Sequence, residues 1–112
     1  MKIILEGKPM STNSIYRNHG HIMFMTKEGK ALKTSYQYQA LSQREGNKPW
    51  AGNIVIDIKL YFGDKRRHDI DNYNKILLDA MTGILWEDDS QIVKMTIWKL
   101  YDKEKPRIEI EI

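Results

Sequence analysis

The segment of residues 53–62 (NIVIDIKLYF) alternates between apolar and other side chains over most of its length. Successive side chains of an extended strand point to opposite faces, so this alternation gives the segment one apolar face. The residues of that face are Ile54, Ile56, Ile58, Leu60 and Phe62. The sequence therefore predicts a β-strand with one buried face, which needs further strands beside it and other elements to cover it.

Four further segments have the alternating or β-branched composition of strands: residues 2–6, 21–25, 91–101 and 107–112. The second could close a hairpin with the turn-rich residues before it. In the third, the better apolar face holds Val93, Met95 and Ile97. In the fourth, the isoleucines alternate with charged residues and are expected to face inward.

Two segments have the features of helices. Thr26 can cap a helix that runs to about Glu45, and its weak apolar stripe suits a helix that covers a sheet. A strongly amphipathic helix is predicted from about Ile70 to Thr82, with a glycine placed to end it. Leu78 lies on the polar side of this second helix, either as a simple exposed leucine or as a subunit contact.

The predicted elements follow the order strands, helix, strand, helix and two strands. This order predicts an α+β fold in which two main helices pack on one side of a mixed β-sheet. The length favours a single domain over residues 1–112.

Cysteine is absent from the 112 residues, which excludes disulfide bonds and thiolate-bound zinc. The apolar runs are too short to span a membrane, and the first ten residues suit a strand better than a signal peptide. We therefore expect a cytoplasmic protein with no membrane contact and no small-molecule cofactor. The formal net charge of +3 is modest, so nucleic-acid binding would require clustered charges.

Charged side chains do cluster between residues 65 and 89. They are the cations Lys65, Arg66 and Arg67, the carboxylates Asp69, Asp71, Glu87, Asp88 and Asp89, and Lys75 one helical turn after Asp71. Phosphodiester hydrolysis requires a metal ion, carboxylates to hold the ion, and cations to position the phosphates. Mg²⁺ prefers oxygen ligands and keeps several waters, so a few carboxylates suffice.

Both acidic groups lie at junctions between predicted elements. If the strand at 91–101 pairs beside the strand at 53–62, the two junctions could meet at one edge of the sheet, and Lys75 would face the same space. Each motif also has a simpler interpretation, because an aspartate can cap a helix and a lysine can pair with a carboxylate four residues away. His19 and His21 are metal-ligand candidates by type, although isolated histidines are more often surface residues.

The run RRHDIDNYNKILLDAM, followed after a short gap by LWEDDSQIV, resembles the signature of the RusA family of Holliday junction resolvases. That signature has a basic run, D-x-D-N, a lysine four residues after the second aspartate, D-A, and then W-x-D-D-x-Q-[VI]. The N-terminal stretch resembles the family's P-x-S-x-N-x-x-Y-R pattern through Pro9, Ser11, Asn13, Tyr16 and Arg17. The resemblance covers nearly the whole chain and is most specific over residues 66–93.

The resemblance implies a homodimer that binds four-way DNA junctions and resolves them by paired symmetric nicks in recombination and repair, with Mg²⁺ or Mn²⁺ as cofactor. It implies that Asp69, Asp71 and Asp89 are metal-binding catalytic carboxylates, with Asp88 adjacent, and that Lys75 is the catalytic lysine. The residues expected to bind DNA are Lys65, Arg66, Arg67, Arg17, Asn13 and Tyr16, with Lys33 as a further phosphate contact. The alternatives are a nuclease that acts on flaps or forks and a junction-binding protein without catalysis.

Overall fold

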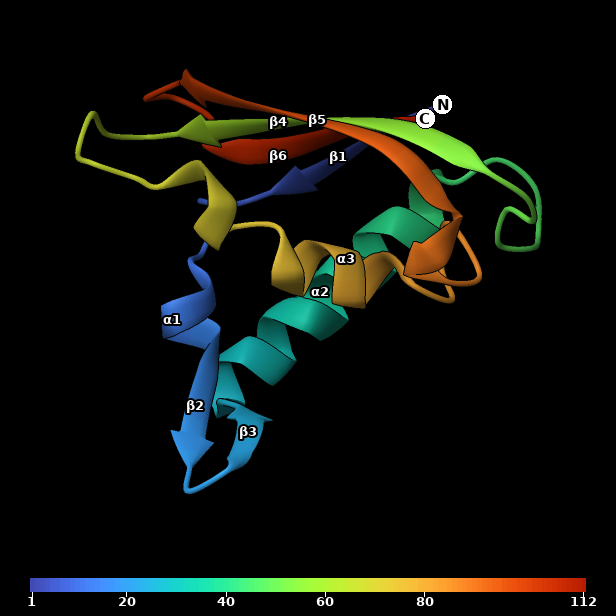
Figure 1. Cartoon of the computed structure of the whole chain (residues 1–112). Helices are drawn as coiled ribbons and strands as arrows, with labels where there is room; N and C mark the ends of the chain where they lie inside the picture. Colours follow the sequence, from blue (N-terminus) through green and yellow to red (C-terminus); the bar gives the residue numbers. More distant parts are fainter.

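The computed structural model describes all residues, 1–112. In chain order the elements are β1 (Lys2–Glu6), α1 (Thr12–Ile15), β2 (Tyr16–His19), β3 (Ile22–Met25), α2 (Lys27–Gln43), β4 (Ile54–Phe62), the 3₁₀ turn η1 (Ile70–Asn72), α3 (Lys75–Met81), the 3₁₀ turn η2 (Asp89–Gln91), β5 (Ile92–Tyr101) and β6 (Arg107–Glu111). A four-stranded mixed sheet has the order β1–β6–β4–β5, and α2 and α3 lie along one side of it (Figure 1). The α+β prediction is confirmed, and the predicted strands and helices occur in the predicted order, with the short helix α1 and the strand β2 in addition.

The core lies between the sheet and the two helices. The alternating face of β4 is buried against them, as the pattern of residues 53–62 predicted. Ile108 and Ile110 of β6 and the apolar side of α3 complete the same cluster. Each fully buried side chain of this kind stabilises the fold by about 1.5–3 kcal/mol relative to exposure. No helix combines the length and the apolar composition that a bilayer crossing requires.

The direction of strand pairing determines where the two acidic junctions lie. β4 and β5 are parallel, with Ile54 paired to Ile92, so both strands start at the same end of the sheet. Asp69 and Asp71 follow the end of β4, whereas Asp89 precedes the start of β5. The two junctions therefore leave the sheet at opposite ends, and the expectation that they meet at one edge is wrong. Parallel strands need a crossover connection, and here α3 provides it.

The predicted helix from Ile70 to Thr82 is broken. It starts as the 3₁₀ turn η1, and the regular helix α3 begins only at Lys75. Residues 71–74, which precede α3, are aspartate, asparagine and tyrosine residues, and these are weak helix formers. The Asn72 carbonyl also accepts a hydrogen bond from the Thr12 hydroxyl at 2.8 Å, which fixes the turn from outside the segment.

Two apolar side chains differ from their predicted placement. Val93 is exposed because a β-bulge at the start of the β4–β5 pairing leaves it without a register partner and turns it outward. Leu78 is half-buried and packs on the core rather than lying on an exposed polar side. The reason is that α3 packs against α2 as well as the sheet, so it buries more than one stripe.

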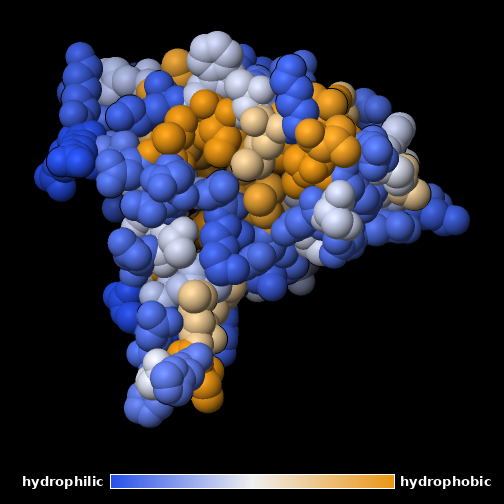
Figure 2. All heavy atoms as spheres, viewed as in Figure 1, coloured by the Kyte–Doolittle hydropathy of each residue, from blue (hydrophilic) through white to orange (hydrophobic).

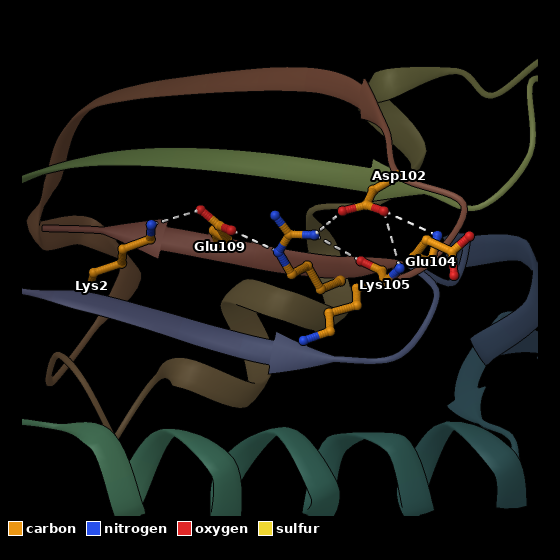
Figure 3. A network of polar contacts seen from close by, with 6 residues as sticks. Lys2, Asp102, Glu104, Lys105 and Glu109 are labelled. Carbon is orange, nitrogen blue, oxygen red and sulfur yellow. Dashed lines mark hydrogen bonds and ion pairs between the residues drawn. The ribbon is translucent and has the colours of Figure 1, made fainter.

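The opposite face of the sheet carries an ion-pair network (Figure 3). Arg107 donates hydrogen bonds to Asp102 at 2.8 Å and to Glu109 at 2.7 Å, and Lys2 pairs with Glu109 at 3.1 Å. The Arg107 guanidinium also lies 3.8 Å from the ring centroid of Tyr61. This face therefore carries paired charges, and no second layer of helices packs on it.

Candidate active site

Asp69 and Asp71 lie within one turn at the end of a long loop. Asp69 immediately precedes η1, and its backbone carbonyl accepts a hydrogen bond from the Asn72 amide at 3.0 Å. Its carboxylate does not cap the turn and makes only a loose 3.7 Å ion pair with Arg67. The Asp71 carboxylate is exposed and has no hydrogen bond or ion pair. The simple capping interpretation therefore fails for Asp69, and both residues keep oxygens free for a ligand.

His68 anchors the loop that carries this turn. Its ring stacks on Phe62 with 4.0 Å between centroids. Its Nε2 is 2.9 Å from an Asp64 carboxylate oxygen, and its Nδ1 is 2.9 Å from the Tyr73 hydroxyl. A neutral imidazole that donates from Nε2 and accepts at Nδ1 satisfies both partners. The hydrogen bond from His68 lowers the pKa of Asp64, and burial raises the pKa of Tyr73.

The basic residues Lys65, Arg66 and Arg67 precede His68 in the loop, and all three are exposed. The Lys65 ammonium lies 4.9 Å from the ring centroid of Tyr101, and Lys99 donates a hydrogen bond to the His68 carbonyl at 3.2 Å. Arg66 and Lys99 help to line a hollow of about 240 Å³ together with Lys65. The loop therefore presents several cations next to the two exposed carboxylates of Asp69 and Asp71.

Lys75 belongs to a second cluster at the start of α3. Its ammonium lies 3.3 Å from a carboxylate oxygen of Asp79, and that same oxygen accepts a hydrogen bond from the Tyr16 hydroxyl. The ammonium is also 5.0 Å from the Tyr16 ring centroid. Burial, followed by the hydrogen bond to Asp79, raises the pKa of Tyr16. Lys75 thus pairs with Asp79 and not with Asp71, because the helix does not extend back to residue 71.

Sequence reasoning did not assign a role to Asp79. The available signal was its position four residues after Lys75, which indicates only an ordinary helical ion pair. Its link to Tyr16 joins residues 63 positions apart and has no local signature. Tyr16 was expected to contact DNA, yet its ring is half-buried and its hydroxyl is engaged with Asp79, whereas Asn13 and Arg17 are exposed.

The second acidic junction is held by hydrogen bonds of its own. Asp88 caps η2 in a capping box with Gln91, and hydrogen bonding by Ser90 lowers the pKa of Asp88. One carboxylate oxygen of Asp89 accepts from the Thr82 hydroxyl at 2.6 Å and from the Trp86 indole N–H at 2.9 Å. Trp86 is fully buried, so Asp89 also has a structural role.

The fit of a divalent ion can be tested against these donors. The structure brings no group of three His, Asp or Glu side chains into a metal-holding arrangement, and His19 and His21 belong to none. Asp89 lies past the far end of α3, a helix of seven residues that spans roughly 10 Å. Asp69 and Asp71 nevertheless offer free, hard oxygens from one turn. Such a pair fits Mg²⁺, which is commonly held by one or two carboxylates, with water and substrate phosphate completing its shell.

Comparison with known proteins gives a consistent set of relatives. A family model described as Endodeoxyribonuclease RusA matches residues 6–112. Crossover junction endodeoxyribonuclease RusA of Escherichia coli strain K12 is 29% identical over 105 residues, which are 93% of this chain and 87% of that protein. The protein of the same name from Enterobacteria phage 82 has the same identity and coverage. Uncharacterized protein YqaN of Bacillus subtilis is 43% identical over 44 residues, which are 39% of this chain and 30% of that protein.

Proposed function

This chain belongs to the RusA family of endodeoxyribonucleases, and from this premise we propose that it resolves Holliday junctions by paired, symmetric, metal-dependent nicks in DNA recombination and repair. The relatives that match over 93% of the chain are crossover junction endodeoxyribonucleases, which supports a four-way junction as the substrate. The observation that carries the proposal is the turn in which the exposed carboxylates of Asp69 and Asp71 cap no helix and lie beside a basic loop. A cytoplasmic location follows from the proposed substrate.

In this proposal Asp69 and Asp71 hold Mg²⁺, which Mn²⁺ can replace. When bound, the ion neutralises charge on the scissile phosphate and lowers the pKa of a water nucleophile. Lys65, Arg66 and Arg67 neutralise backbone phosphates, so binding is driven by shape and charge and weakens with salt. Asn13 and Arg17, which are exposed in α1 and β2, contact further phosphates in this proposal.

Lys75 and Asp89 complete the proposed catalytic set. Lys75 stabilises charge at the reacting phosphate, and Asp79 holds its ammonium in place at 3.3 Å. Asp89 accepts its two hydrogen bonds on one oxygen, which leaves the other oxygen available to a ligand. Asp89 lies beyond the far end of α3 from Asp69 and Asp71, so we assign it to the set on the sequence signature and not on its position.

The sheet offers support for a homodimer. β5 is an edge strand of ten residues with one side unpaired, and such edges are usually covered. Met95 and Ile97 on this strand are only half-buried. Hydrophobic side chains gather between the sheet and the helices on the face shown in Figure 2. A two-fold pair of subunits would supply two sites and hence two incisions per junction.

The proposal is tested with Asp71→Asn, which removes a metal-binding charge from an exposed side chain. We expect loss of junction cleavage in Mg²⁺ with junction affinity retained, measured by gel assays on a mobile four-way junction. Glu104→Gln is the matched control, because it removes one exposed carboxylate that lies in the β5–β6 connection and not in the Asp69–Asp71 turn, and it should cut normally. Full activity of Asp71→Asn would exclude the assigned site.

The same assay separates the alternatives. Faster cutting of a flap than of a four-way junction, at equal protein, would assign the enzyme to other branched DNA. Junction binding without any metal-requiring nick would identify a binding protein that lacks catalysis.

A further inference from the structure

The β2–β3 hairpin stands apart from the rest of the fold. It pairs with no strand of the main sheet and projects beyond the start of α2, at the bottom of Figure 1. Two strands alone are rarely stable in water, so the hairpin depends on contacts at its base. Met25 provides one of these contacts, because its side chain packs closely against Gly29 of α2. A Cβ atom added to Gly29 would lie only 2.8 Å from Met25 Cγ. Tyr16 provides the other through its hydrogen bond to Asp79.

The register of the hairpin separates its two faces. Arg17 pairs with Phe24, and His19 pairs with Ile22. Directly opposed residues of an antiparallel pair lie on the same face, so these four side chains share one face. All four are exposed, with Ile22 at 68% and Phe24 at 48%. The face that carries the half-buried Tyr16 is the one tied to the body of the protein.

The composition of the exposed face is unusual for a surface without a partner. Ile22 and Phe24 place two large apolar side chains in solvent on this face, and Met23 is also exposed, on the opposite face of the hairpin. Figure 2 shows hydrophobic atoms on this projection. Exposed apolar groups of this kind mark interaction sites more often than scattered single residues do. Residues 16–25 contain no acidic side chain, and Arg17 places a positive charge beside Phe24. The charge therefore suits a polyanion.

We propose that the face formed by Arg17, His19, Ile22 and Phe24 is a stacking platform for unpaired bases at the branch point of the DNA substrate. The inference rests on the proposed junction substrate and names the part of it that this surface binds. An aromatic ring beside cations is the usual composition of sites for unpaired nucleotides, because every base offers a π-face and every nucleotide a phosphate. Intact duplex arms keep their bases stacked on one another, so the platform favours DNA that is opened at a branch.

The position of the hairpin agrees with this role. Its first residue, Tyr16, bonds Asp79, which also holds the proposed catalytic Lys75. A base bound on the hairpin is therefore held by an element that starts at the active site. Selection of branched over linear DNA would then occur next to the scissile phosphate.

The test uses Phe24→Ala and Phe24→Trp in the full-length protein, bound without metal ion to a four-way junction that carries 2-aminopurine at the branch point. The wild-type protein should raise 2-aminopurine fluorescence by unstacking the base. Phe24→Ala should lose this rise and bind the junction roughly tenfold more weakly, with duplex affinity unchanged. Phe24→Trp should retain the wild-type affinity for the junction, because it keeps an aromatic ring at this position. Tyr38→Ala is the control, because it removes an aromatic ring that is 70% exposed on α2.

Three results would overturn the platform. One is wild-type fluorescence and affinity in Phe24→Ala; another is an equal loss of duplex and junction binding. The third is a change in the sedimentation mass of Phe24→Ala, which would make this face a subunit contact instead. The readout is binding, so failure of the platform leaves Mg²⁺-dependent cleavage by the wild-type protein intact, whereas failure of the proposed function would appear as absence of that cleavage.

Discussion

Asp79 accepts hydrogen bonds from two residues that lie far apart in the sequence. Its carboxylate fixes the Lys75 ammonium at 3.3 Å and accepts the Tyr16 hydroxyl on the same oxygen. A lysine side chain has several rotatable bonds, so a partner that limits its positions matters for any role at a phosphate. Under the proposed function, Asp79 is therefore a positioning residue that would act through Lys75.

Replacement of Asp79 tests this arrangement. Asp79→Asn should slow junction cleavage about 10- to 100-fold, while junction affinity changes little. This loss is smaller than the loss expected on removal of a group that itself acts in catalysis, because Lys75 stays in place. Single-turnover cleavage and gel-shift assays measure the two quantities. Tyr16→Phe keeps the Lys75–Asp79 pair, so its effect should be smaller. An Asp79→Asn enzyme that cuts at the wild-type rate would remove the positioning role.

Asp71 and Asp89 differ in their contribution to stability. Asp89→Ala leaves the indole N–H of the buried Trp86 without an acceptor, which should lower the free energy of unfolding by about 1–3 kcal/mol. Asp71→Ala removes no interaction and should leave stability nearly unchanged. Urea denaturation of the two variants checks the difference. Equal destabilisation by both changes would show that the turn at Asp71 depends on its side chain.

At the scale of elements, the alternation in residues 53–62 predicted the central strand because burial on one face imposes that pattern directly. The break before α3 had no such signal, since the Thr12 hydroxyl that bonds the Asn72 carbonyl is 60 positions away. The sequence did not predict that β5 runs parallel to β4, because the alternation of apolar side chains is the same for parallel and antiparallel strands. These two features decide the site, since they separate Lys75 from Asp71 and Asp89 from both. The candidate acids were therefore predictable, but their distribution over the fold was not.

The packing of Gly29 in α2 predicts that alanine at this position lowers stability, although alanine is the better helix former. Gly29 is buried, and an added Cβ would lie 2.6 Å from Ile15 Cγ2 and 2.8 Å from the Ile15 carbonyl oxygen. Alanine normally stabilises a helix relative to glycine by about 1 kcal/mol. Gly29→Ala should instead destabilise the protein by about 1–3 kcal/mol through overpacking against α1.

Thermal or urea unfolding measures this effect, with the exposed Lys30→Ala as the control in the same helix turn. A Gly29→Ala protein that is more stable than the wild type would show that α1 moves away from α2 without cost.

At the scale of the whole molecule, the ion-pair network on the open sheet face makes stability depend on pH. Burial raises the pKa of Glu109, but hydrogen bonds from Arg107 and Lys2 outweigh it and lower the pKa overall. The hydrogen bond from Arg107 likewise lowers the pKa of Asp102. A carboxylate with a depressed pKa stabilises the folded state above its unfolded pKa, near 4 for these groups. That stabilisation is lost as the pH falls through the folded value.

Glu109→Gln tests the contribution of Glu109, the buried carboxylate of this network. It should lower the free energy of unfolding at pH 7 by about 1–2 kcal/mol, because it removes a nearly buried charge that accepts two charged hydrogen bonds. The difference from the wild type should shrink toward zero between about pH 4 and pH 2, where the wild-type carboxyl also becomes neutral. Urea denaturation at these pH values measures it, and a pH-independent difference would indicate a packing effect.

The central claim concerns the assembled enzyme, in which two subunits with one site each would make two cuts. It is tested most directly by mapping cleavage on all four strands of a mobile four-way junction, with and without Mg²⁺. The account predicts nicks at symmetric positions in two opposing strands, only when Mg²⁺ or Mn²⁺ is present. Single unpaired nicks, cutting in the presence of a chelator, or an uncut junction beside a cut flap would contradict it.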